Sequence, residues 1–250
     1  MSNLPRAITA AAAGVGGKKT YFAFAHYNDS SSHNVSLYEL DSGTLTKLSS
    51  IQARSGDSAS YAVGVAFHPD PSTYGKYLAV TTPAGYSIID YSDDTSLTEI
   101  DTGGSASKNL YGVAYNASGS NLFTTGSSVG YHYKYDVASD GTLSNETQSA
   151  YHGIAERIYS IALAKTKDVG MVVYAKGNSA DIGAQSFTPS TNALDDSVVT
   201  STEEVVQCDV SPDGTYGVFI GKDFVSHPKY SAGRINIDSS NNLSLDTQRS

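Results

Sequence analysis

The chain has 250 residues, of which only 16% are charged, and 25 acidic against 16 basic side chains give it a net charge of −9. No cluster of basic residues is larger than Lys18-Lys19. The sequence therefore lacks the positive surface that binds nucleic-acid phosphates, and we expect no nucleic acid as a partner. A chain of this length buries about 70–75% of the surface that it exposes when unfolded, which is enough for one large domain.

The sequence carries neither a membrane signal nor a disulfide pattern. No stretch approaches the ~20 apolar residues of a membrane span. The alanine-rich run from Ala7 to Val15 ends in glycines and lysines rather than at a cleavage site, so we expect no membrane span and no export by a signal peptide. The single cysteine, Cys208, lies in an alternating apolar run, and we expect it to be a buried strand residue.

The first predicted strands are short and alternate between apolar and polar residues. They cover residues 6–13, 20–25, 34–40 and 45–51. The turns between them are rich in Asp, Ser, Asn and Gly, which supply the backbone conformations that tight hairpins need. The same order recurs farther along, for example at residues 111–115, 121–125, 131–136 and 143–147. We therefore predict a meander of antiparallel hairpins without helices.

Each group of four strands is one copy of a repeat. The residue that ends the opening strand recurs at intervals of 48, 48 and 47 residues, as Phe67, Tyr115, Leu163 and Val210. A leucine that follows a polar turn recurs at Leu45, Leu97, Leu143, Leu194 and Leu243. Five leucines indicate five units, which we place at residues 6–53, 61–104, 109–150, 157–201 and 204–250.

A repeat of 40–50 residues with four strands is typical of β-propeller blades. Gly64, Gly112 and Ser160 occupy one position of the opening strand, where innermost strands converge and large side chains would collide. The sequence therefore predicts an all-β fold, a single-domain five-bladed β-propeller of four-stranded antiparallel blades. We expect the ring to close by packing of the first blade on the fifth, without a strand shared between the termini.

Two turns of the repeat resemble a known superfamily. Phe67-His68-Pro69-Asp70 and Val210-Ser211-Pro212-Asp213-Gly214-Thr215-Tyr216, together with Ser42-Gly43-Thr44-Leu45-Thr46, resemble blades of the YVTN and lactonase-like propellers and, more distantly, WD repeats. The likeness extends from about residue 6 to the end. Lactonase-like propellers usually carry seven blades, whereas this chain has five and no tryptophan. The blade count is shared with five-bladed lectins such as the tachylectins, but their tryptophan motifs are absent from the sequence.

The histidines fit no metal-ligand spacing because they are scattered over different repeats. They are His26, His33, His68, His132, His152 and His227. His68 and His227 precede prolines in turns, and we expect them to be solvated. His26 and His152 stay open as candidates, because a propeller brings distant turns together on one face.

Other chemical motifs are also weak. The glycine-rich stretch Ala12–Thr20 departs from the phosphate-loop pattern and is followed by a strand rather than a helix. The acidic pairs Asp93-Asp94, Asp195-Asp196 and Glu203-Glu204 fit solvated turns and strand edges better than a calcium loop. The sequence thus predicts no catalytic residue, no metal site and no cofactor.

Tyr131, Tyr133 and Tyr135 are the strongest candidates for a binding surface. They alternate with His132 and Lys134 along one strand, so their rings share one face of the sheet. Tyrosine combines an apolar ring with a hydroxyl, which suits protein interfaces and sugar stacking. The pattern favours a packing layer between blades over this binding surface.

The function expected from these observations is a non-enzymatic structural or interaction propeller. The polar, hydroxyl-rich composition suggests a component of a larger assembly of protein subunits, such as the tail, nozzle or capsid decoration of a tailed-bacteriophage virion, with cytoplasmic or extracellular placement as alternatives. A second hypothesis is a lectin-like propeller that binds glycans. A lactonase-like hydrolase is the third.

Overall fold

A computed structural model describes residues 8–13, 20–26, 33–54, 61–93, 95–126, 130–152, 157–175, 182–201, 204–222 and 230–249. All regular structure in these residues is β-strand, arranged as five antiparallel sheets of four consecutive strands each. The predicted all-β propeller fold with five four-stranded sheets is thereby confirmed. Among the described residues no helix is long and apolar enough to cross a membrane.

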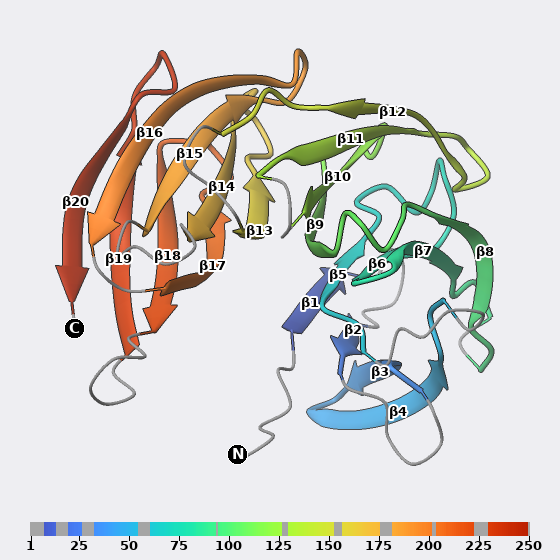
Figure 1. Cartoon of the computed structure of the whole chain (residues 1–250). Helices are drawn as coiled ribbons and strands as arrows, with labels where there is room; N and C mark the ends of the chain where they lie inside the picture. The colour runs from blue at the N-terminus through green and yellow to red at the C-terminus, as the bar shows by residue number, and fades with distance from the viewer. Residues whose placement is uncertain are drawn as a thin grey trace.

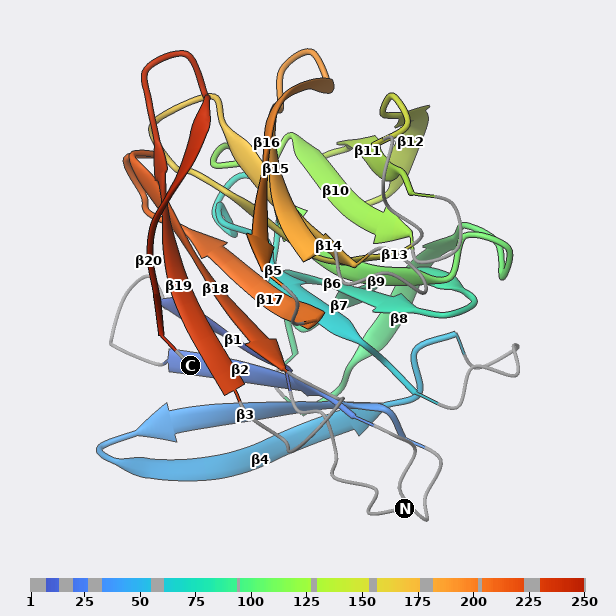
Figure 2. The ribbon, with the colours of Figure 1, turned by 60° about the vertical axis from the view of Figure 1, so that its left-hand side comes forward.

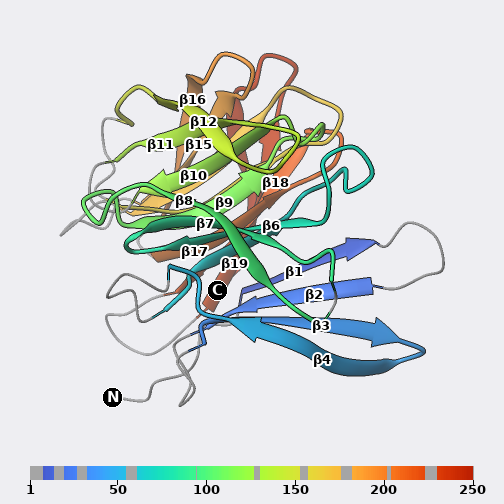
Figure 3. The same ribbon diagram turned by 90° about the vertical axis from the view of Figure 1, so that its right-hand side faces the viewer.

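The strands follow the repeat closely. The first sheet contains β1 (Ile8–Ala13), β2 (Thr20–Ala25), β3 (Val35–Asp41) and β4 (Thr44–Ile51). The second contains β5 (Gly64–Phe67), β6 (Tyr77–Thr82), β7 (Gly85–Asp90) and β8 (Thr98–Gly103). The third contains β9 (Leu110–Tyr115), β10 (Asn121–Gly126), β11 (His132–Val137) and β12 (Leu143–Gln148). Figure 3 shows the strands of the first sheet side by side in the order of the chain.

The last two sheets have the same internal order. The fourth contains β13 (Arg157–Leu163), β14 (Gly170–Ala175), β15 (Ile182–Thr188) and β16 (Ala193–Ser201). The fifth contains β17 (Glu204–Val210), β18 (Tyr216–Lys222), β19 (Tyr230–Ile237) and β20 (Leu243–Arg249). Figure 2 shows β20, β19, β18 and β17 next to one another in this order. In each of the five sheets the register shifts between the third and fourth strands, which increases the local twist.

The core is divided into four hydrophobic clusters, each between two consecutive sheets. The forward face of a sheet is defined here as the face toward the next sheet along the chain, and the back face as the opposite one. Because side chains alternate along a strand, each inner sheet sends one set of residues into the cluster before it and the other into the cluster after it. In the fourth sheet, for example, Val172 points back and Met171 and Val173 point forward.

The five sheets form an arc with the first and fifth sheets at its ends (Figure 1). Innermost strands contact each other from β1 to β5, β9, β13 and β17 in turn. Within the described residues no hydrophobic cluster joins the fifth sheet to the first, and no strand is shared between them. The expected packing of the first blade on the fifth is therefore not seen there.

The inner strand of the fifth sheet supplies a physical reason for the missing contact. At Gly64 and Gly112, an added Cβ would lie 2.5 Å from Tyr111 O and 2.9 Å from Ser160 Cα, respectively, on the next inner strand. The register places Ser160 and Gln207 at the same position, opposite Val173 and Ile220. Gln207 is exposed, and so large a side chain would not fit a junction as close as the others.

Candidate functional site

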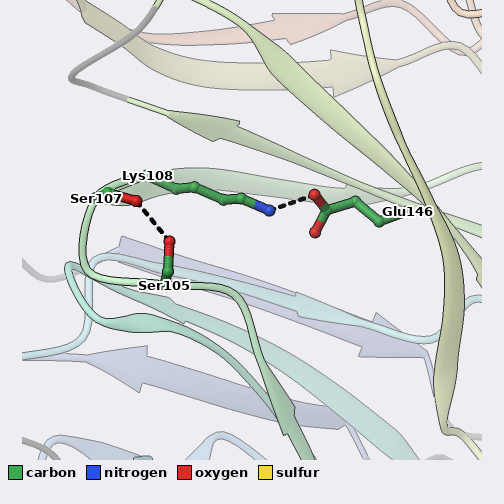
Figure 4. A network of polar contacts seen from close by, with 4 residues as sticks. All are labelled: Ser105, Ser107, Lys108 and Glu146. Atoms are coloured by element: carbon green, nitrogen blue, oxygen red, sulfur yellow. Dashed lines mark hydrogen bonds and ion pairs between the residues drawn. The ribbon is translucent and has the colours of Figure 1, made fainter.

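The loop between β8 and β9 holds a compact polar network, which we call the Lys108 site (Ser105, Ser107, Lys108, Tyr133 and Glu146). Lys108 N donates to Ser105 O at 2.9 Å and closes a tight turn. This turn brings the hydroxyls of Ser105 and Ser107 within 2.6 Å of each other. Lys108 Nζ forms an ion pair with Glu146 on β12 (Figure 4). The network thus joins the loop before the third sheet to the outermost strand of that sheet.

Tyr133 orients the ammonium group of this site. Lys108 Nζ lies 4.5 Å from the centre of the Tyr133 ring, a distance at which the ring face attracts a cation. Gly126 keeps the space open, since an added Cβ there would lie 2.9 Å from Lys108 O and 3.3 Å from the Tyr133 ring. The side chains of Lys108 and Glu146 are 20% and 37% exposed, so both can be reached by solvent.

Three tyrosines near Glu146 have raised pKa values. Burial, with the nearby Asp101 and Glu146 carboxylates, raises the pKa of Tyr86 to about 12. Burial and Glu146 also raise the pKa of Tyr133 and of Tyr135 above the usual value. These hydroxyls stay protonated at neutral pH. The site therefore combines a carboxylate that can accept a proton with an ammonium that can hold an anionic oxygen.

The three tyrosines proposed as a binding surface lie in different surroundings. Tyr133 and Tyr135 are buried in the cluster between the second and third sheets, and the Tyr135 ring packs on Tyr86 with centroids 5.2 Å apart. Tyr131 is partly buried and packs against the exposed Tyr151 at 5.5 Å. Tyr133 and Tyr135 therefore pack between two sheets, Tyr131 lies at the margin of the same cluster, and the binding surface stays a prediction.

A second polar network, the histidine pair (His132 and His152), lies between the third and fourth sheets. His132 Nδ1 is 3.0 Å from His152 Nε2. The other nitrogens face amides of the fourth sheet: His132 Nε2 is 2.7 Å from Asn192 Oδ1, and His152 Nδ1 is 2.5 Å from Gln185 Oε1. The rings pack among apolar neighbours, with His132 4.3 Å from the Phe187 ring.

The protonation of the histidine pair follows from its burial. Desolvation lowers the pKa of His132 to about 3, helped by the neighbouring His152, and lowers the pKa of His152 to about 4. The three contacts Asn192–His132, His132–His152 and His152–Gln185 each need one donated hydrogen. Two neutral imidazoles supply only two N–H groups, and an amide oxygen at each end of the row supplies none. Asn192 Nδ2 is buried without a partner, so the row is completed when this amide turns and donates to His132.

The remaining histidine predictions have mixed outcomes. His68 is buried, not solvated: its Nε2 lies 3.0 Å from Gly119 O of the next sheet, and its ring packs between Tyr74 and Tyr115. The turn that holds His68 is tucked between two sheets, which the local sequence does not reveal. His26 Nε2 lies 3.1 Å from Ser36 Oγ. His227 lies outside the described residues.

The structure also shows the surroundings of residues from the acidic pairs and of the cysteine. Asp196, expected to be solvated, instead accepts a hydrogen bond from Leu243 N of the next sheet at 2.8 Å, while Asp195 is exposed. Asp94 and Glu203 lie outside the described residues. Cys208 is buried as predicted, and burial raises its pKa to about 12. Among the described residues no three His, Cys, Asp or Glu side chains gather to hold a metal ion.

The hydroxyl-rich composition has a local explanation. In turn after turn an aspartate accepts hydrogen bonds from a Ser or Thr two residues later, as Asp70 does from Ser72 and Asp140 from Thr142. These bonds lower the pKa of Asp70 to about 2. Some of the Ser and Thr residues therefore serve self-bonding turns.

Comparisons with known proteins address the fold. No protein-family model and no curated protein matches the sequence. Solved structures do match. A chain of the Kuenenia stuttgartiensis hydrazine synthase has a TM-score of 0.68 at 12% identity, over 90% of this chain and 62% of that chain. A Bacteroides fragilis protein named "putative 6-phosphogluconolactonase" has a TM-score of 0.64 at 13% identity, over 90% and 66%. A Lactobacillus plantarum protein has a TM-score of 0.66 at 16% identity, over 91% of this chain and 67% of that chain.

These likenesses correct one expectation and support another. A lactonase by name appears among the matched structures, and none of the three is a virion or glycan-binding protein by name, so the expected non-enzymatic virion component is contradicted. This chain spans only 62–67% of the three matched chains. About a third of the Bacteroides chain therefore has no counterpart in this chain. At 12–16% identity the comparisons establish the fold alone, that of a β-propeller.

Proposed function

We propose that this chain is a lactonase-like hydrolase that opens small lactones derived from sugar acids. The observation that carries the proposal is the ion pair of Lys108 with Glu146 over the Tyr133 ring. The named lactonase among the structures of the same fold supports it. Fold likeness by itself does not transfer an activity, so the site has to supply the chemistry.

Lactone opening needs a general base and a group that stabilises negative charge, and Glu146 and Lys108 can supply these two functions. Water attacks the ring carbonyl carbon, the bond from this carbon to the ring oxygen breaks, and the ring oxygen leaves as an alcohol. Glu146 takes the proton from the attacking water and returns it to the leaving oxygen, which is general base and acid catalysis. Lys108 holds the carbonyl oxygen while it carries negative charge. Because the two groups are paired, a carbonyl bound to Lys108 lies next to Glu146.

The surroundings of the site favour a small polar substrate. Ser105 and Ser107 place two hydroxyls beside Lys108, and both can bond to sugar hydroxyls. An anionic substituent would be attracted to the positive charge of Lys108. Substrates with a phosphate or with hydroxyls only are therefore both worth assaying.

The test is a lactone hydrolysis assay with the purified chain. Acid release from glucono-δ-lactone and from 6-phosphogluconolactone is followed in weak buffer and compared with the uncatalysed rate. We expect catalysis by the parent and a loss of about 100-fold or more in kcat in Glu146→Gln, the usual size of a general-base contribution. Lys108→Met should lose rate as well.

A matched control removes a lysine elsewhere. Lys47 is exposed on β4 of the first sheet, so Lys47→Met should retain the parental rate. The alternative that the chain is not an enzyme predicts no acid release above the buffer blank with either lactone, and this result would overturn the proposal. Equal rates in the parent and in Glu146→Gln would show that any activity comes from another site.

A further inference from the structure

A row of three tyrosine rings leads away from the Lys108 site. Lys108 Nζ lies 4.5 Å from the centre of the Tyr133 ring. Tyr131 and Tyr133 both pack on the cluster between the second and third sheets, so their side chains share one face of the third sheet. Tyr131 in turn packs against Tyr151, with ring centres 5.5 Å apart. These three rings, called here the tyrosine row, connect the ammonium group to an exposed position.

The first two rings of the row lie beside the loop that carries Lys108. Gly126 N donates to Tyr131 O at 3.1 Å. A Cβ added to Gly126 would lie 2.9 Å from Lys108 O and 3.3 Å from the Tyr133 ring. Burial, the Glu146 carboxylate and then the Tyr131 hydroxyl raise the pKa of Tyr133, which also indicates that the two tyrosine side chains are close. The loop and the row are therefore neighbours across one glycine.

Tyr151 forms the exposed end of the row. Its side chain is 52% exposed, which is unusual for a ring of this size in an internal sheet. The backbone next to it is fixed, because His152 N donates to Gly130 O, directly before Tyr131, at 3.1 Å. A ring held in place in this way loses little conformational entropy when a ligand binds to it.

The chemistry of the row favours an uncharged ligand with hydroxyl groups. Each tyrosine offers an apolar ring face and a polar hydroxyl, which suit the C–H groups and the hydroxyls of a sugar ring. Lys134 lies on the same strand but points to the other face, where its Nζ donates to Pro189 O and Ser190 O at 3.1 and 3.0 Å. Its ammonium group is therefore turned away from the row, and a phosphate there would not meet it.

We propose that the tyrosine row is a second sugar subsite, so that the substrate is the lactone of a disaccharide acid whose other sugar ring stacks on Tyr151. This inference rests on the lactonase function proposed above. Tyr131 and Tyr133 are about 6.5 Å apart along one face of the strand, and Tyr151 lies one ring contact farther. With the lactone carbonyl at Lys108, a single sugar ring does not reach Tyr151, whereas a second ring does.

The experiment compares cellobiono-δ-lactone with glucono-δ-lactone as substrates of the purified chain. The parent should have a kcat/KM that is about fivefold or more higher for the disaccharide lactone, the size of an aromatic stacking contact. Tyr151→Ala should remove most of this preference through a higher KM for cellobiono-δ-lactone, and Tyr151→Phe should keep it because the ring remains. As a matched control, Leu45→Ala removes a 49% exposed apolar side chain of the first sheet and should keep the parental preference.

Binding of the product acids provides a readout that needs no turnover. By titration calorimetry the parent should bind cellobionate about fivefold or more tightly than gluconate, and Tyr151→Ala should lose this difference. Hydrolysis of glucono-δ-lactone with the same preference in the parent and in Tyr151→Ala would overturn the subsite and leave the proposed function standing. Tyr151-dependent binding of cellobionate without hydrolysis of either lactone would support the subsite and overturn the hydrolase. Neither hydrolysis nor binding would overturn both.

Discussion

His132 Nδ1 lies 3.0 Å from His152 Nε2, in the buried layer between the third and fourth sheets. The two residues come from the beginning of β11 and from the segment after β12. Their outer nitrogens reach the fourth sheet, so the pair links two sheets through neutral imidazoles. Protonation of either ring would place a charge in this layer.

Stability should therefore fall in mild acid. Both histidines have a pKa well below the ordinary value of 6.5, about 3 for His132 and about 4 for His152. The unfolded chain takes up these protons below pH 6.5 while the folded chain does not, so the stabilisation is complete above 6.5 and is lost as the pH falls toward 4. We expect the free energy of unfolding to drop by on the order of 4 kcal/mol between pH 7.5 and pH 5, about half from each histidine, as measured by urea denaturation.

A variant separates this effect from general acid sensitivity. His152→Gln removes one titrating group and should reduce the dependence of stability on pH over this window, although it also lowers stability at neutral pH. Thr46→Gln, at an exposed position of the first sheet that carries no titrating group, should leave the slope unchanged. A parental slope that persists in full in His152→Gln would contradict the assignment.

The aspartates between sheets should contribute to stability only where a following sheet is present. Asp196→Ala removes the acceptor of Leu243 N and should cost about 1–3 kcal/mol, because it leaves a backbone donor unpaired. Asp246→Ala, on the outer strand of the fifth sheet, should change stability little, since its exposed ion pair with Arg234 is weak. Urea denaturation of the two variants gives the comparison, and equal losses would speak against the repeated role.

The small residues of the inner strands should tolerate no enlargement within the arc. Gly112→Ala places a Cβ 2.9 Å from the backbone of Ser160 and Ile161, so we expect a loss of about 1–3 kcal/mol from overpacking. Gln207→Ala makes the corresponding position of the fifth sheet smaller, where no described strand follows, and should be nearly neutral. Thermal unfolding would reveal the difference, and a neutral Gly112→Ala would show that the junction can widen.

Much of the fold could be predicted because its signals are local. Alternation of apolar and polar residues sets each strand, and turns such as Ser42-Gly43, both with positive φ, set each hairpin. The predicted strands at 111–115, 121–125, 131–136 and 143–147 differ from β9 to β12 by one residue at most at either end. Repetition of the pattern every 48 or 47 residues then identified the sheets.

Most residues of the candidate sites could not be predicted from the sequence. Lys108 and Glu146 are 38 residues apart and His132 and Asn192 are 60 apart, and no spacing rule links them. A faint signal existed in the polar loop Ser105-Ala106-Ser107-Lys108, but turns of similar composition occur throughout the chain. The burial of His68 could not be predicted either, because it depends on the neighbouring sheet that covers its turn.

The sequence by itself determined the repeat, the four strands of each sheet and the small residues on the inner strands, because each depends on contacts within a unit of about 48 residues. Only the tertiary structure decided which side chains meet between units and that the fifth sheet ends the described arc with Val218 and Ile220 uncovered. The physical reason is that the stacking of one sheet on the next determines both the contacts between units and the side chains left uncovered. This stacking depends on side chains that are distant in the sequence.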